Sequence, residues 1–307
     1  MPSVSLPAFA KINLRLHILG RRPDGYHELR TIFQAISLHD TLELESQRSA
    51  RIDLTIEGND GLAAEPSRDN LVYRALAAAR KELGLRHGVR ARLLKRIPVG
   101  RGLGGGSSDA AAALTGLAAL AKKRIAPARM IQIGSRLGAD VPFFLFGGQA
   151  LGVGRGDEIY PLPDGPRRTV LVVSPQDIAV CTAEAYGWLR ARLTKRPSAS
   201  RLSSFCALCW STQGGGTWND FESVVFPRHS RLKNIKRDLL KSGAVEASLA
   251  GSGSAVFALF RSPAQARRAA QAFPHDQIFI CETLSRGEYC SAQRGRGGAG
   301  IRSRRRR

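Results

Sequence analysis

The chain is organised around one glycine-rich stretch, which reads Pro98-Val99-Gly100-Arg101-Gly102-Leu103-Gly104-Gly105-Gly106-Ser107-Ser108-Asp109. Five of the seven residues 100–106 are glycine. Glycine tolerates positive φ and lets a ligand approach the backbone, because it has no Cβ. A strand-like run precedes the stretch and an alanine-rich, helix-like run follows it, so unpaired N–H groups and the positive helix dipole would face a ligand. The stretch predicts a polyphosphate-binding loop.

Two familiar nucleotide-binding motifs do not fit this loop. No Lys-Ser or Lys-Thr pair follows the last glycine, so it is not a Walker A sequence. There is no suitable βαβ unit with an acidic residue about twenty positions on, as a dinucleotide fold requires. A flexible linker is disfavoured, because the glycines lie directly between a strand and a helix. The hydroxyl groups of Ser107 and Ser108 can donate hydrogen bonds to the ligand, or one of them can cap the helix.

The regions on both sides of the loop have clear periodicities. Residues 8–18 alternate between apolar side chains and a polar row that includes Lys11 and Asn13, which predicts a half-buried strand. Asp69 is expected to cap a helix that runs to about Leu83, with Gly84 as the residue that stops it. Further strands are expected at 31–38, 41–45, 51–57, 89–94, 169–173, 245–249, 255–260 and 277–282. Further helices are expected at 108–121, 127–137, 182–193, 229–242 and 263–272, and a long loop at 194–218.

This order of elements predicts an α+β protein with two domains. The first, residues 1–165, would hold the glycine-rich loop. The second, residues 166–285, would be a compact sandwich of the split βαβ type. Residues 286–307 carry eight arginines and no apolar period, so we expect a disordered basic tail.

Composition narrows the class of protein. At 43% hydrophobic and 23% charged residues the chain is typical of soluble globular proteins, and it shows neither a membrane-spanning run nor a signal peptide. We therefore expect a cytoplasmic protein. The five cysteines are expected to be free thiols. Cys206 and Cys209 form half of a zinc motif without a second half, so no metal site is expected.

The formal net charge of +22 favours polyanionic partners, either nucleic acid or phosphorylated metabolites. The segment from Arg286 onward supplies +7 of this charge, and the rest is spread along the chain. Charge alone does not choose between the two kinds of partner.

The glycine-rich loop resembles the phosphate loop of the GHMP kinases. Five further segments resemble the same superfamily in the same order over about residues 4–285, namely 7–14, 22–29, 138–144, 219–222 and 248–257. Residues 7–14, 22–29 and 138–144 resemble the members that act on diphosphocytidyl-methylerythritol. Arg101 stands where a small residue is usual, and Ser252 where threonine is common. An arginine there could point to solvent or reach a phosphate.

The resemblance implies a GHMP kinase fold, with an N-terminal α+β domain and a ferredoxin-like C-terminal domain. It implies ATP-dependent phosphorylation of the 2-hydroxyl of diphosphocytidyl-methylerythritol, with Mg²⁺ expected alongside ATP and no protein ligands assigned to it. ATP would contact the loop, residues Pro98, Val99, Gly100, Arg101, Gly102, Leu103, Gly104, Gly105, Gly106, Ser107 and Ser108. The protein would be a monomer or a homodimer.

The resemblance also assigns roles to individual residues. Asp140 would be the catalytic base, and Lys11 would lie beside it and favour its ionised form. Without that context, Asp140 would be read as a helix cap and Lys11 as a solvated side chain. The implied substrate contacts are Asn13, Tyr26, His27, Thr182, Gly251, Ser252 and Gly253. Thr182 is equally compatible with a helix cap, and residues 251–253 with a tight turn.

Two other functions remain as alternatives. One is another GHMP kinase, of the homoserine or mevalonate type, which residues 10–13 and 24–27 argue against. The other is a nucleic-acid-binding protein that uses the arginine tail, although the body of the chain shows no RNA-binding module with interleaved aromatic residues.

Overall fold

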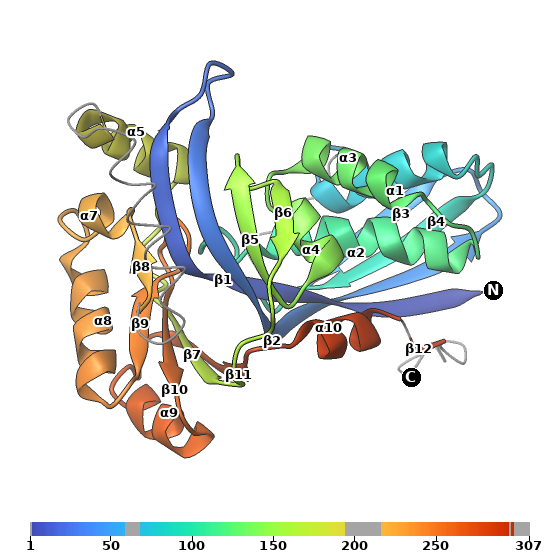
Figure 1. Ribbon diagram of the computed structural model, residues 1–307. Helices are drawn as coiled ribbons and strands as arrows, with labels where there is room; N and C mark the ends of the chain where they lie inside the picture. Colours follow the sequence, from blue (N-terminus) through green and yellow to red (C-terminus); the bar gives the residue numbers. More distant parts are fainter. Residues whose placement is uncertain (1, 59–67, 194–215, 295, 298–307) are drawn as a thin grey trace.

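The protein folds around two β-sheets, as the computed structural model in Figure 1 shows. The structure describes residues 2–58, 68–193, 216–294 and 296–297. Among these residues, no helix is long and apolar enough to cross a membrane. The prediction of an α+β fold is confirmed, because each sheet is covered by its own helices.

The first sheet is built on two long antiparallel strands, β1 (Ser3–Arg21) and β2 (His27–Gln47). Its order is β12-β1-β2-β4-β3, with β5 paired to β2, β6 to β5, and β8 to β1. The remaining strands are β3 (Ile52–Glu57), β4 (Gly88–Leu94), β5 (Gln149–Gly154), β6 (Glu158–Pro161), β8 (Trp218–Asn219) and β12 (Arg296–Gly297). The expected strands 31–38 and 41–45 are both parts of β2.

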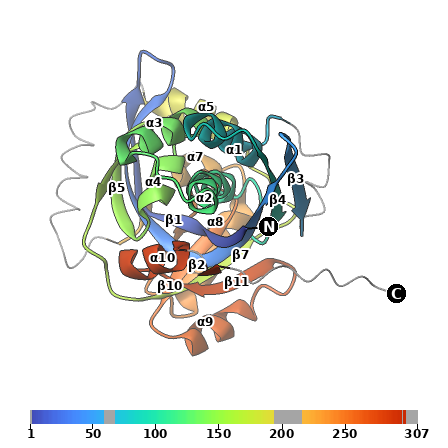
Figure 2. The same ribbon diagram turned by 90° about the vertical axis from the view of Figure 1, so that its right-hand side faces the viewer.

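Four helices lie over the first sheet: α1 (Leu71–Glu82), α2 (Gly105–Leu120), α3 (Pro127–Leu137) and α4 (Val141–Phe146). The alanine-rich α2 packs on β1 and β2 and lies at the centre of the group in Figure 2. Its small side chains let it approach the sheet closely. Eleven of its sixteen residues are buried, so this helix forms the middle of the first core.

The second sheet has the order β11-β7-β10-β9, built from β7 (Thr169–Ser174), β9 (Glu246–Leu249), β10 (Val256–Phe260) and β11 (Gln277–Glu282). All its neighbouring strands are antiparallel. Its helices are α5 (Thr182–Leu193), α7 (Glu222–Val225), α8 (Ser230–Lys241) and α9 (Pro263–Ala270). The first strand lies between the fourth and third, which is the ferredoxin-like order, so the predicted split βαβ sandwich is confirmed.

The structure corrects several local predictions. Asn70, not Asp69, caps α1, and its Oδ1 accepts the Val72 N–H at 2.8 Å. The helix after the glycine-rich loop begins at Gly105 rather than at 108, with Gly104 in the left-handed conformation at its N-cap. The short elements α4, β5, β6, α7, β8 and β12 were not predicted. None of them has more than six residues, and their sequences show no clean alternation or helical period of apolar side chains.

The prediction of a disordered tail from residue 286 is wrong for its first eight residues. They form helix α10 (Arg286–Gln293), which Figure 1 places beside the first sheet. Ser285 and Glu288 form a capping box at its start, and Tyr289 is buried. These local contacts order a segment whose composition indicated disorder. Residue 295 and residues 298–307 lie outside the described residues, and so do Cys206 and Cys209. The boundary near residue 165 stays a prediction.

An apolar seam joins the two sheets. Ile12 and Ile36 from the first sheet are buried in one cluster with Val172 and Phe257 from the second. Thr283, just after β11, also forms a β-bridge with Ile36 of β2. The relative placement of the sheets therefore depends on this shared core.

Replacing Phe257 by alanine should destabilise the protein by about 3–5 kcal/mol, because the ring is fully buried and leaves a cavity in the seam. Chemical denaturation measures the change. Ile280→Ala on β11, where the side chain is 38% exposed, is the control and should cost only about 0.5 kcal/mol. Equal losses for the two variants would show that the seam does not contribute as described.

Candidate active site

A cavity of about 1040 Å³ opens where the glycine-rich loop faces β1, α4 and α5. The predicted site residues that line it are Lys11, Asn13, Tyr26, His27, Pro98, Val99, Gly100, Arg101, Gly102, Leu103, Gly104, Gly105, Gly106, Ser107, Asp140, Thr182, Gly251 and Ser252. Ser108 and Gly253 are not among the lining residues. Ser108 is buried inside α2, and Gly253 packs against the side chain of Leu249. Segments far apart in the sequence thus meet in one cleft.

The glycine-rich loop is held from two sides. The Lys11 backbone N–H donates to the Leu103 carbonyl at 3.0 Å, which joins the loop to β1. Gly102 has a φ of 78°, and a Cβ there would overlap the carbonyl oxygen of Ala250. Only glycine allows this close approach between the loop and the turn after β9. The N-terminus of α2 is thereby fixed at the wall of the cavity, as an anion-binding loop requires.

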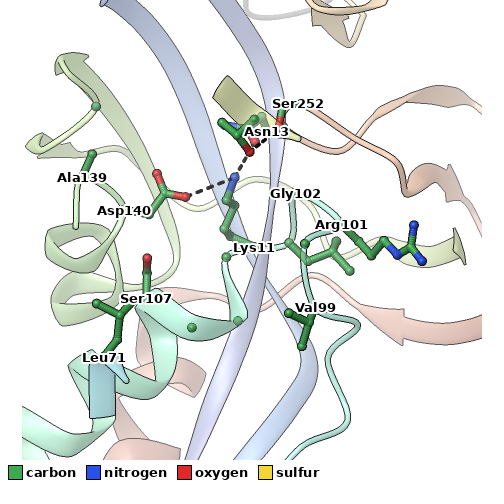
Figure 3. A pocket seen from close by; sticks show the side chains of 18 of the residues that line it. Lys11, Asn13, Leu71, Val99, Arg101, Gly102, Ser107, Ala139, Asp140 and Ser252 are labelled. Carbon is green, nitrogen blue, oxygen red and sulfur yellow. Dashed lines mark hydrogen bonds and ion pairs between the residues drawn. The ribbon is translucent and has the colours of Figure 1, made fainter. Parts of the chain in front are cut away.

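Lys11 and Asp140 form an ion pair inside the cavity. Lys11 Nζ lies 3.5 Å from Asp140 Oδ2, and Figure 3 shows the two side chains pointing toward each other. Asp140 occupies the N-cap position of α4, yet within the described chain its side chain makes no capping hydrogen bond. The carboxylate faces Lys11 instead. Its side chain is 33% exposed, so a ligand in the cavity can reach it.

A short chain of hydrogen bonds holds the Lys11 ammonium. Nζ donates to Asn13 Oδ1 at 2.8 Å, and Asn13 Nδ2 donates to Thr31 Oγ1 at 2.7 Å. Thr31 Oγ1 in turn donates to the Arg15 carbonyl at 2.7 Å. Lys11, Asn13 and Thr31 are all buried. Because each partner is fixed by the next, the ammonium has little freedom to leave Asp140.

Arg101 neither points to solvent nor reaches toward the pair. Its guanidinium donates to the Ile178 carbonyl and, at 2.5 Å, to Ser254 Oγ. Ser254 Oγ donates to the same Ile178 carbonyl at 2.6 Å. In Figure 3 the arginine side chain extends away from Lys11 and Asp140. The departure at this position therefore ties the loop to the second half of the chain.

Aromatic and hydroxyl side chains line the other end of the cavity. The His27 ring stacks on Tyr186 with centroids 4.6 Å apart, and the Arg155 guanidinium lies 4.9 Å from the centroid of the Tyr26 ring. Thr182 Oγ1 and Ser252 Oγ are 2.9 Å apart, so their hydroxyls form a hydrogen-bonded pair at the wall. Burial, with a smaller contribution from the charge of Asp140, raises the pKa of Tyr186.

A buried charge cluster supports the base of the loop. Lys95 Nζ donates to Asp40 and, at 2.7 Å, to Asp109 Oδ2, and all three side chains are buried. Asp40 also accepts the Ile97 N–H at 2.8 Å, just before the loop. Burial and the nearby charge of Asp40 outweigh the attraction of Lys95 and raise the pKa of Asp109 to about 8. Two carboxylates share one ammonium, so one proton stays with the cluster near neutral pH.

Sequence reasoning missed several residues of this site. Tyr186 lies on α5, where no motif marks it. Lys95 and Asp40 are 55 positions apart in the chain, and only the pairing of β2 with β4 brings them together. Asp109 was noticed as the end of the loop, but nothing in the sequence indicated a buried partner.

The chain matches known protein families over most of its length. The family described as GHMP kinases N terminal domain matches residues 70–148, and the one described as GHMP kinases C terminal matches residues 195–277. A 4-diphosphocytidyl-2-C-methyl-D-erythritol kinase from Solibacter usitatus is 46% identical over 289 residues, which cover 92% of this chain and 90% of that protein. The enzyme of the same name from Pelotomaculum thermopropionicum is 39% identical and covers 91% of this chain and 97% of its own.

Solved structures give the same result. A crystal structure of 4-(cytidine 5'-diphospho)-2C-methyl-D-erythritol kinase has a TM-score of 0.74 and 35% identity, and covers 91% of this chain and 98% of its own. Homoserine kinase from Cytophaga hutchinsonii has a TM-score of 0.69 at 19% identity, covering 93% of this chain and 95% of its own. The second likeness is one of fold alone.

The Asp109 proton should make stability depend on pH. A carboxyl whose pKa is raised in the folded state binds a proton on folding, so its contribution is complete below the unfolded pKa and is lost as pH rises through the folded value. Relative to Asp109→Asn, which cannot ionise, the wild type should lose up to about 1.4 kcal/mol per pH unit between about pH 4 and pH 8. Urea denaturation of both proteins across this range measures it. If the difference in unfolding free energy between the two proteins does not change with pH, the cluster does not hold the proton described here.

Proposed function

This chain belongs to the 4-diphosphocytidyl-2-C-methyl-D-erythritol kinases of the GHMP kinase superfamily, and we propose that it performs their reaction. It transfers the γ-phosphoryl group of ATP to the 2-hydroxyl of 4-(cytidine 5'-diphospho)-2-C-methyl-D-erythritol, a step of the non-mevalonate route to isoprenoid precursors. The observation that carries this proposal is the Lys11–Asp140 pair in a cavity that also contains the glycine-rich loop.

The two ends of the cavity suit the two substrates. ATP binds with its phosphates along residues 98–107, at the N-terminus of α2, where backbone N–H groups and the helix dipole favour negative charge. The acceptor enters beside β1 and α5. Its reacting hydroxyl then lies between the Asp140 carboxylate and the terminal phosphate of ATP.

The transfer is a direct displacement at phosphorus. Asp140 accepts the proton of the acceptor hydroxyl as its oxygen attacks the γ-phosphorus, and the bond to the β,γ-bridging oxygen breaks to release ADP. Lys11 carries a positive charge next to this point and stabilises the negative charge on the transferred group. Asn13 and Thr31 keep the ammonium in place, so little reorganisation is needed during the reaction.

The acceptor side contains groups suited to a cytosine base and a polyol. A base presents a flat π-face, and aromatic rings such as Tyr26, His27 and Tyr186 line this end of the cavity. Arg155, over the Tyr26 ring, adds a positive charge near the diphosphate of the acceptor. The Thr182 and Ser252 hydroxyls offer hydrogen bonds to hydroxyl or phosphate oxygens.

Magnesium enters with ATP in this proposal. Within the described parts of the chain, no group of three or more His, Cys, Asp or Glu residues could hold a metal ion. The ion is therefore expected to be held largely by the ATP phosphates, where it neutralises their charge. The roles given above to Asp140, Lys11 and the other residues are contacts with the substrates or with the transferred proton, and none of them is a contact with the magnesium ion.

Three earlier expectations stay predictions: a cytoplasmic location, a monomer or homodimer, and the assignment of each site residue. The homoserine alternative rests on a likeness of fold only. The nucleic-acid alternative rests on a tail whose residues 298–307 lie outside the described part of the chain.

Asp140→Asn should lower kcat for this acceptor by about 10²–10⁴-fold, because the amide removes the general base and keeps the shape. Asp238→Asn, at a carboxylate on the outer helix α8, is the matched control and should keep wild-type activity. Coupled release of ADP measures the rate, and phosphorus NMR of the product locates the new phosphate.

Homoserine and mevalonate serve as competing acceptors in the same assay. Turnover of the cytidyl acceptor alone is the expected result. If the wild type binds ATP but phosphorylates homoserine or mevalonate instead, the proposed acceptor is wrong. The membership of the GHMP kinase superfamily would not be affected.

A further inference from the structure

The C-terminal segment links the second sheet to the helix that bears Asp140. After β11 the chain bridges to β2 at Thr283, and the Leu284 N–H donates to the Ala35 carbonyl at 2.9 Å. Helix α10 follows directly and lies beside α4. Nothing in the catalytic scheme above uses this segment.

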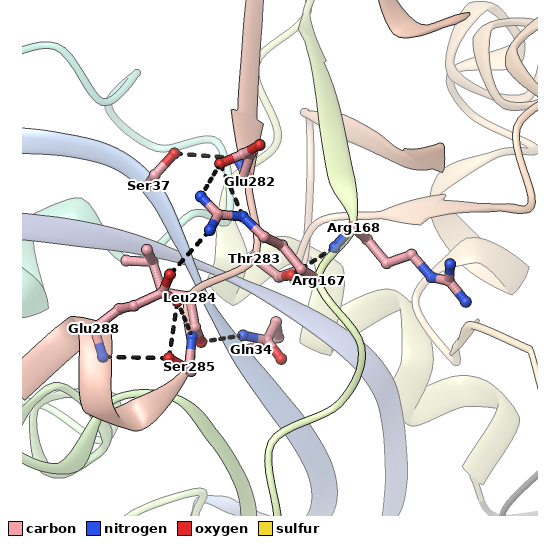
Figure 4. A network of polar contacts seen from close by, with 9 residues as sticks. All are labelled: Gln34, Ser37, Arg167, Arg168, Glu282, Thr283, Leu284, Ser285 and Glu288. Atoms are coloured by element: carbon pink, nitrogen blue, oxygen red, sulfur yellow. Dashed lines mark hydrogen bonds and ion pairs between the residues drawn. The ribbon is translucent and has the colours of Figure 1, made fainter. Parts of the chain in front are cut away.

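The start of α10 is held by a polar network. Figure 4 shows Arg167, just before β7, reaching both Glu282 at the end of β11 and Glu288 in α10. Glu288 accepts the Ser285 N–H at 2.9 Å, which completes the capping box. From the other side, Gln34 Nε2 of β2 donates to the Leu284 carbonyl at 2.9 Å. These contacts fix α10 to both sheets.

Helix α10 in turn contacts the C-terminal end of α4. Tyr289 is 2% exposed, and its hydroxyl donates to the Phe144 carbonyl at 2.6 Å. The ring lies against Gly147, which has a φ of 64°, and a Cβ there would overlap the ring. Arg286 lies against Gly148 in the same way, so that a Cβ there would overlap it, and its guanidinium donates to the Gln149 carbonyl at 2.6 Å. The Gly147–Gly148 pair is thus shaped to receive α10.

The contact is significant because α4 has only six residues. The last carbonyls of a helix have no intrahelical partner, and in a helix this short they are most of its carbonyls. The Gly147 N–H donates to the Phe143 carbonyl at 2.9 Å, and the Tyr289 hydroxyl donates to the next carbonyl, that of Phe144. Burial raises the pKa of Tyr289, so its hydroxyl keeps the proton that it donates.

Asp140 lies at the opposite end of the same helix. Within the described residues its side chain does not cap α4, so its direction is set by where α4 lies and by Lys11. A shift of α4 along its axis would change the 3.5 Å separation of Lys11 Nζ and Asp140 Oδ2 directly. Even a shift of about 1 Å would be large on the scale at which catalytic groups must be placed.

We propose that Tyr289 is a positioning residue: its hydrogen bond to the Phe144 carbonyl anchors α4 and thereby aims the Asp140 carboxylate. Tyr289 does not line the cavity and touches neither substrate. This inference rests on the proposed function, because it assigns Asp140 the role of base.

The test uses Tyr289→Phe, which keeps the buried ring against Gly147 and removes only the hydroxyl. Tyr160→Phe, the same change at a tyrosine that is 55% exposed on β6, is the matched control. The removal of one buried hydrogen bond should lower kcat about fivefold to tenfold, with the KM of ATP and of the cytidyl acceptor unchanged within about twofold. Tyr160→Phe should match the wild type.

Two further readouts separate positioning from general stability. In the Asp140→Asn background, Tyr289→Phe should cause no further loss of the residual rate, because its effect acts through that carboxylate. Hydrogen exchange of residues 141–147 should be faster in Tyr289→Phe than in the wild type, whether or not the acceptor is a substrate.

An unchanged kcat, or an equal loss in the Asp140→Asn background, would overturn the proposal. Unchanged exchange in residues 141–147 would also overturn it. If the wild type itself does not phosphorylate the cytidyl acceptor, the proposed function fails, and the exchange result alone then decides whether Tyr289 anchors α4.

Discussion

The ammonium of Lys11 sits almost fully buried, and a charge in that position requires partners. Its partners are the Asn13 amide oxygen beside it on β1 and the Asp140 carboxylate from α4. The pair therefore joins the first strand of the sheet to a helix that follows it by more than a hundred residues. The position of the glycine-rich loop is tied to the same strand, because Leu103 accepts the backbone N–H of Lys11.

The cleft forms where the glycine-rich loop contacts both halves of the chain. Gly102 permits contact with Ala250, and Arg101 bonds to Ile178 and Ser254, so the backbone of the glycine-rich loop is fixed against the ferredoxin-like half. The seam around Phe257 holds the two sheets at that spacing. Packing of the seam thus sets the distance between the glycine-rich loop and the parts of the cavity wall that the second half of the chain supplies.

Residues with a regular period or a short motif could be predicted from the sequence. The alternation along residues 8–18 gave β1 and its polar row, and the glycine-rich stretch indicated the loop before α2. The resemblance brought Lys11 and Asp140 together, and the structure places them in one ion pair. Contacts that depend on tertiary packing could not be predicted from the sequence. These are the ion pair of Lys95 with Asp40, the stacking of Tyr186 on His27, and the packing of Tyr289 against Gly147. The composition of residues 286–307 as a whole was misleading for α10, since a capping box and one buried tyrosine order its eight residues ahead of the part that is rich in glycine and arginine.

The central claim is that Lys11 and Asp140 act as one unit on the transferred phosphoryl group. A double-mutant cycle with Lys11→Met, Asp140→Asn and the double variant tests it, using single-turnover rates with ATP and the cytidyl acceptor. Residues that act together lose activity non-additively, so the double variant should be within about threefold of the slower single variant. Losses that multiply would show that the two side chains work independently, which would contradict the account.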